Sequence, residues 1–145
     1  MLGKCVIAEY FDDGEVREEF CLEFISLWDG WLGPEHYHKL DEVTPSQWQR
    51  FHHLIALLFA KYDLYAVDLE NYSAEKLTQF DNFLPSYEQD LNRGASEFTM
   101  LIIPSLHALL VETWDYTYIL YHQNNGAVEA LSPFVGQSQL FHFSD

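Results

Sequence analysis

The chain of 145 residues is 48% apolar and strongly acidic, since 23 Asp and Glu against seven Lys and Arg give a formal net charge of −16. This length and apolar content predict one folded domain over residues 1–145 and exclude an acidic disordered tail. The acidity argues against nucleic acid and anionic membranes as partners and favours a basic protein, although acidity that only maintains solubility is an equally simple explanation.

The N-terminal residues predict a β-hairpin with strands over residues 4–11 and 15–24. Gly14, in the left-handed conformation, would close its three-residue loop. This register pairs Glu9 with Arg17, whereas a loop shorter by one residue would set two acids opposite each other. The second strand and the residues after it also fit a helical period, so a helix there is the competing prediction.

The two cysteines, Cys5 and Cys21, would face each other across this hairpin, and they form no CxxC motif. We expect reduced thiols, although a cross-strand disulfide is conceivable. The opening residues turn acidic before a signal-like apolar stretch can form. The longest apolar run, residues 54–60, is far too short to span a bilayer. Together these features predict a cytoplasmic protein.

The strongest helix prediction covers residues 45–62. Thr44 can cap this helix, Pro45 suits its first position, and Gln47 completes a capping box. One apolar stripe indicates a central, buried helix. The stripe consists of Trp48, Phe51, Ile55, Phe59 and Tyr62.

A second helix is predicted to begin after Ser73, to bend at Pro85 and to end at Gly94. Three strand-like runs follow, over residues 98–104, 107–113 and 116–122. A short helix over residues 125–136 and a strand over residues 140–143 complete the chain. This order predicts an α+β fold, in which an antiparallel sheet packs against a few helices. The last of the three runs is apolar on both faces, which predicts a central strand.

Two histidines could bind metal, because His36 and His38 alternate in a segment that precedes Asp41. Alternate residues of an extended segment point the same way, so the two imidazoles and the carboxylate could hold zinc. No further ligand has a recognisable spacing, and no HExxH motif occurs. We therefore expect a solvent-exposed loop, a protein that folds without metal, and no cofactor.

Motifs for catalysis are missing. The sequence contains no GxSxG elbow, no GxGxxG and no phosphate-binding GKS or GKT, and it is poor in the cations that phosphate substrates need. We therefore predict no catalytic residues and no enzyme activity.

Aromatic residues beside acids are typical anchors of protein interfaces. Such pairs occur in "LWDGW" and in "WDYTYILYH", and two further acids lie in the turn of the predicted hairpin. Most of the aromatic rings are expected in the core, but the turn between the last two strand-like runs should be exposed. The predicted partner-binding residues are Asp12, Asp13, Trp28, Asp29, Trp114 and Asp115.

The stretch "WDYTYILYHQNNGAVEALSPFVGQSQLFHF", residues 114–143, resembles the C-terminal region of small bacterial immunity proteins of polymorphic toxin systems. These systems include contact-dependent and type VI secretion. The resemblance implies a cytoplasmic protein that blocks one cognate toxin by tight binding. The charge is consistent with it, because toxin nucleases are often basic and an acidic inhibitor complements them.

Two other functions remain open from the sequence. One is a small metal-dependent enzyme that uses His36 and His38. The other is an acidic adaptor, or a mimic of the charge of a nucleic acid. A bound metal, or a cleft lined by histidines and carboxylates, would favour the enzyme. A regular row of carboxylates at phosphate-like spacing would favour the adaptor or mimic.

Overall fold

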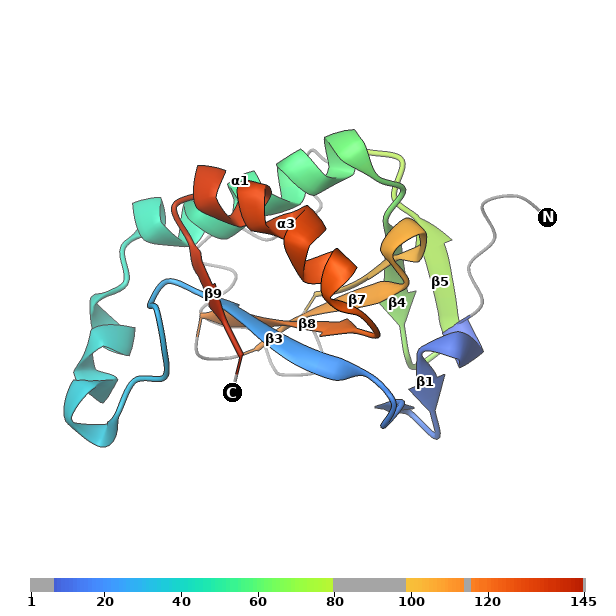
Figure 1. The fold of residues 1–145 in the computed structure, drawn as a ribbon, viewed down its shortest axis with the longest axis horizontal. Coiled ribbons are helices and arrows are strands. Elements are labelled where there is room, and N and C mark those ends of the chain that lie inside the picture. The colour runs from blue at the N-terminus through green and yellow to red at the C-terminus, as the bar shows by residue number, and fades with distance from the viewer. Residues whose placement is uncertain (1–6, 80–98, 114–115, 145) are drawn as a thin grey trace.

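The computed structural model describes residues 7–79, 99–113 and 116–144 (Figure 1). Among these residues, seven strands form one antiparallel sheet in the order β5-β4-β6-β7-β8-β3-β9. The strands are β3 (Cys21–Ser26), β4 (Tyr65–Asp68), β5 (Ser73–Lys76), β6 (Met100–Ile103), β7 (Ala108–Glu112), β8 (Thr117–His122) and β9 (Phe141–Phe143). Figure 1 shows helices α1 (Pro45–Lys61) and α3 (Asn125–Gln137) on the same face of this sheet. The predicted α+β fold is confirmed.

The predicted N-terminal hairpin is present, but its predicted register is wrong. Strand β1 (Phe11–Asp12) pairs with β2 (Glu15–Val16) across a two-residue loop. Both loop residues have a positive φ, 55° at Asp13 and 82° at Gly14, as a hairpin turn of the mirror-image type requires. The ladder has two residue pairs, so Glu9 lies outside it and its pairing did not decide the register.

Strand β3 begins at Cys21, after a turn that separates it from β2. The predicted strand over residues 15–24 is therefore two strands, and the competing helix is also wrong. Strand β3 pairs with β8 and β9 rather than with the N-terminal segment. Cys21 lies opposite His122 of β8 and has a free, exposed thiol. Cys5 lies outside the described residues.

Helix α1 is confirmed with its capping box. Thr44 Oγ1 accepts a hydrogen bond of 3.2 Å from the Gln47 backbone N–H, and Gln47 Oε1 accepts one of 2.9 Å from the Thr44 N–H. Helix α3 begins at Asn125, as predicted, and the Asn124 side chain caps it by accepting from the Gly126 N–H. Gly136 lies inside α3 rather than ending it.

The predicted start of the second helix is wrong, because Ser73–Lys76 is strand β5, an edge strand paired with β4. A turn between them sets this pairing. The Asp68 carboxylate accepts hydrogen bonds from the backbone N–H groups of Glu70 and Asn71 and from the Asn71 side chain. The side-chain bond from Asn71 contributes most to lowering the pKa of Asp68. Residues 80–94 of the predicted helix lie outside the described residues.

Both faces of the sheet carry apolar cover. On one face, α1 and α3 pack against β3, β6, β7 and β8, and this is the main core. On the other face, the N-terminal segment packs on the half of the sheet that contains β4, β6 and β7. That second cluster consists of Ile7, Tyr10, Phe11, Phe20, Tyr65, Ile102 and Leu109.

Strand β8 lies between β7 and β3, so the predicted central strand is confirmed. No helix in the described part of the chain combines the length and apolarity needed to cross a bilayer.

Candidate functional site

An acidic hairpin, residues 9–19, carries six exposed acids and one base. The base, Arg17, is engaged within the hairpin segment. Its Nε donates a hydrogen bond of 2.8 Å to the Ala8 carbonyl, and its Nη1 lies 3.8 Å from Glu19 Oε1. A shallow hollow of about 320 Å³ opens among these side chains. The exposed acids are Glu9, Asp12, Asp13, Glu15, Glu18 and Glu19.

A second feature is a pocket of about 410 Å³ at the end of strands β3 and β8. We call it the aromatic pocket. Its walls come from the loop after β3 and from the 3₁₀ helix η2 (Pro34–Glu42), while two hydroxyl residues belong to the strands. Side chains that line it include Ser26, Trp28, Trp31, Tyr37, Leu40 and Thr117.

Trp31 folds back over the sheet face that the helices leave free. Its ring centroid lies 4.5 Å from that of Phe24 in β3 and 5.2 Å from that of Phe143 in β9, both in edge-on geometry. Trp31 is nevertheless 50% exposed, and Tyr37 is 55% exposed. The wall of the aromatic pocket therefore contains a ring, Trp31, that packs against the sheet, and both Trp31 and Tyr37 have surface that a partner can reach.

The predicted partner-binding residues do not form one site. Asp12 and Asp13 belong to the acidic hairpin, whereas Trp28 lines the aromatic pocket and the exposed Asp29 follows it in the chain. Figure 1 shows the hairpin and η2 toward opposite ends of the molecule. Trp114 and Asp115 lie outside the described residues. The flanking backbone is held together, since the N–H and the hydroxyl of Thr113 both donate to the Thr117 carbonyl.

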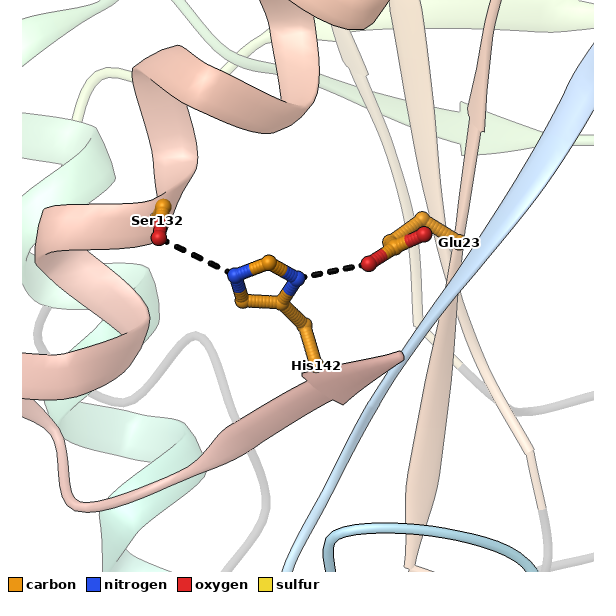
Figure 2. Close-up of polar contacts among 3 residues, drawn as sticks. All are labelled: Glu23, Ser132 and His142. Carbon is orange, nitrogen blue, oxygen red and sulfur yellow. Dashed lines mark hydrogen bonds and ion pairs between the residues drawn. The ribbon is translucent and has the colours of Figure 1, made fainter. Parts of the chain in front are cut away.

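A third feature joins three elements through side chains (Figure 2). The Glu23 carboxylate of β3 accepts a hydrogen bond from His142 of β9, with 2.6 Å between Oε2 and Nδ1. The other ring nitrogen, Nε2, lies 3.0 Å from the Ser132 hydroxyl of α3. The Glu23 side chain is only 9% exposed. We call this the Glu23–His142–Ser132 chain; its order, acid to imidazole to hydroxyl, is that of a serine-hydrolase triad.

The surroundings of Ser132 do not match such a triad. Ser132 lies inside α3, where backbone N–H groups are used in the helix, and the next residue, Pro133, has none. Neither Ser132 nor Pro133 therefore offers a free backbone N–H to stabilise an oxyanion. Ser132 also lines neither of the two hollows described above. The contacts suit a tether that holds β9 against α3 and β3.

No sequence signal could have found this chain of contacts. Its members are separated by 119 and by 10 residues, and only the pairing of β3 with β9 brings Glu23 and His142 together. The aromatic pocket was partly foreseeable, because "LWDGW" contains two tryptophans. Nothing in the sequence places Tyr37 beside them.

The geometry assumed for a zinc site is wrong. His36 and His38 belong to η2, a 3₁₀ helix rather than an extended segment, so residues two apart do not share a direction. Their ring centroids are 6.4 Å apart, and both side chains are exposed. Within residues 7–79, 99–113 and 116–144, no group of three or more His, Cys, Asp or Glu could hold a metal ion.

His52 occupies a different environment. It packs on Trp48 of the same helix, with ring centroids 4.9 Å apart, and burial lowers its pKa. This places it at the edge of the core rather than in a ligand set.

Comparisons with known proteins add no relative: no family model matches the chain, and neither does any curated protein or solved structure.

Proposed function

We propose that this chain is an acidic inhibitor that binds and neutralises a basic protein, in the manner of a cytoplasmic immunity protein acting on a cognate toxin domain of the nuclease type. The acidic hairpin carries the proposal. Six exposed carboxylates lie within eleven residues, and the one base among them is already engaged by Ala8 and Glu19. The single base of this segment cannot neutralise its six carboxylates, so they can attract a basic partner.

The physical advantage of this surface lies in association. A nuclease that binds a phosphate backbone carries a basic surface, and an acidic face of comparable density attracts that surface over distance. Long-range attraction increases the association rate more than it slows dissociation, so an inhibitor gains speed against a toxin that has already entered the cell.

The lining of the two hollows favours a binding protein over an enzyme. The hollow in the acidic hairpin is lined by carboxylates, Val16 and Arg17, and the aromatic pocket is lined by aromatic rings, two leucines, a glycine and two hydroxyl residues. The Glu23–His142–Ser132 chain has the side-chain order of a hydrolase, but the helix backbone at Ser132 and Pro133 has no free N–H for an oxyanion. These features support an interaction protein.

The first experiment tests neutralisation. A candidate toxin domain, such as a basic protein encoded by a neighbouring gene, would be expressed in bacteria with and without this chain, and growth would be measured. We expect growth to be restored only when both are present. Failure of the chain to bind or neutralise the neighbouring domain would contradict the proposal.

The second experiment tests the role of charge. Replacing hairpin acids by their amides should lower the association rate about tenfold at low salt and leave dissociation nearly unchanged. The hairpin variant would be Asp12→Asn with Glu15→Gln and Glu18→Gln. A matched control removes three exposed charges elsewhere: Glu70→Gln, Glu75→Gln and Glu129→Gln.

Stopped-flow mixing at several salt concentrations measures both rates. The control should change the association rate by less than about twofold, because its charges are spread over the turn before β5, β5 itself and α3 instead of being gathered in one segment. An association rate that does not depend on salt, or equal effects of the two triple variants, would show that the acidic hairpin does not steer the partner.

A further inference from the structure

The polar groups of the aromatic pocket form an ordered set. Ser26 Oγ accepts from Thr117 Oγ1 at 3.2 Å and from the Trp28 N–H at 3.4 Å, and it donates to the Tyr116 carbonyl at 3.3 Å. Its donor and both of its acceptor positions are therefore used. Ser26 and Thr117 are both buried.

The Thr117 hydroxyl keeps only its acceptor lone pairs for a ligand. Its proton is directed to Ser26 Oγ, so toward the pocket this hydroxyl can only accept. A ligand group that reaches it must be a donor. Carboxylates and phosphates, which only accept, do not suit this position.

The walls and the rim favour a cation. Trp28, Trp31 and Tyr37 contribute aromatic rings, whose faces attract positive charge. The segment from residue 28 to residue 42 carries four exposed acids and one lysine. The acids are Asp29, Glu35, Asp41 and Glu42.

We propose that the aromatic pocket binds an arginine side chain of the basic partner. A guanidinium is planar, always charged and rich in donors, so it can stack on the rings while one N–H donates to the Thr117 hydroxyl. The identity of the partner rests on the proposed function, whereas the chemistry of the pocket does not. The pocket then supplies a fixed anchor at one end of the molecule, and the acidic hairpin supplies attraction at the other.

The test uses the chain alone and a small probe, N-acetyl-arginine methylamide. The neutral comparison is the citrulline analogue, which has the same shape without the charge. Binding would be followed by tryptophan fluorescence and by the NMR signal of the Trp31 indole N–H. We expect the arginine probe to bind at least about fivefold more tightly than the citrulline probe.

Three variants complete the test. Trp31→Ala should abolish the preference for arginine, and Tyr37→Ala, which removes a more exposed ring, should weaken it at least about threefold. Tyr72→Ala removes an aromatic ring of similar exposure in the turn between β4 and β5, and it should have no effect. Thermal melts establish that each variant is folded, and Tyr37→Ala decides the matter if Trp31→Ala is not.

The outcomes separate this proposal from the proposed function. Equal binding of both probes, tighter binding of an apolar probe such as N-acetyl-leucine methylamide, or no binding at all would overturn the arginine site, even if the toxin domain is still neutralised. Selective arginine binding that depends on Trp31 and Tyr37 would support it, even if the neighbouring toxin domain proves not to be the partner.

Discussion

At the scale of single residues, the carboxylate of Glu23 is buried, and a buried charge is costly unless it is paired. A carboxylate removed from water needs a hydrogen-bonded partner, and His142 provides one at 2.6 Å. His142 also reaches Ser132, so one imidazole connects strand β3, strand β9 and helix α3. The short edge strand β9 is thereby fixed by side chains as well as by its backbone pairing with β3.

This contact predicts unequal effects of two substitutions. His142→Ala should lower the free energy of unfolding by about 1.5–3 kcal/mol, the usual range for a hydrogen bond to a charged group. Ser132→Ala should cost less than about 1 kcal/mol, because the hydroxyl is neutral and only part-buried. Urea denaturation of both variants measures the difference.

A second substitution controls for the cause. Most of the cost of His142→Ala should come from the carboxylate left without its partner. Glu23→Gln, added to His142→Ala, should therefore recover part of the lost stability. If Ser132→Ala proves the more damaging change, or if Glu23→Gln deepens the loss, the tether does not act through the buried charge.

At the scale of elements, the sequence predicts best where its signals are local. The capping box of Thr44 and Gln47 and the apolar stripe that follows define α1 without reference to the rest of the chain. The runs that form β6, β7 and β8 are apolar enough to be recognised as strands. Strand β5 has the sequence Ser-Ala-Glu-Lys, which is polar and suits a helix equally well, and its pairing with β4 decides its conformation.

The candidate sites were less predictable for the same reason. Trp28 and Asp29 could be chosen from the sequence because aromatic and acidic residues adjoin there. Ser26 and Thr117, the hydroxyl residues of the aromatic pocket, are paired across β3 and β8 and have no local signal. The strand pairing that joins residues far apart in the chain is the part of the fold that single-sequence patterns did not supply.

Strand β8 offers a direct test of how the two faces of the sheet differ. Leu120 is 1% exposed and packs in the main core under the helices, whereas its neighbour Ile119 points to the other face and is only half-buried. Leu120→Ala should lower stability by about 2–5 kcal/mol, and Ile119→Ala should cost clearly less. Denaturant melts of the two variants provide the comparison, and equal losses would mean that both faces are packed equally tightly.

At the scale of the whole molecule, two apolar clusters account for the fold. One lies between the sheet and the helices α1 and α3, and the other lies between the sheet and the N-terminal segment. The exposed acids of the acidic hairpin lie outside both clusters, whereas Tyr10 and Phe11 of the same segment belong to the second. Replacing the acids should therefore alter association without removing core contacts. Stability and recognition can therefore be measured separately.

We also predict that folding of the whole domain does not depend on metal. A structural zinc ion would have to be held by several ligands that converge, and its removal would unfold a domain that relied on it. His36 and His38 are exposed on η2, and the described residues bring no third ligand to them. Thermal melts with and without a chelator should therefore agree within about 2 °C, since a domain of this size shifts by several degrees for each kcal/mol lost. A fall of many degrees on chelation, restored by added zinc, would mean that a metal site contributes to the fold and would return His36 and His38 to consideration as its ligands.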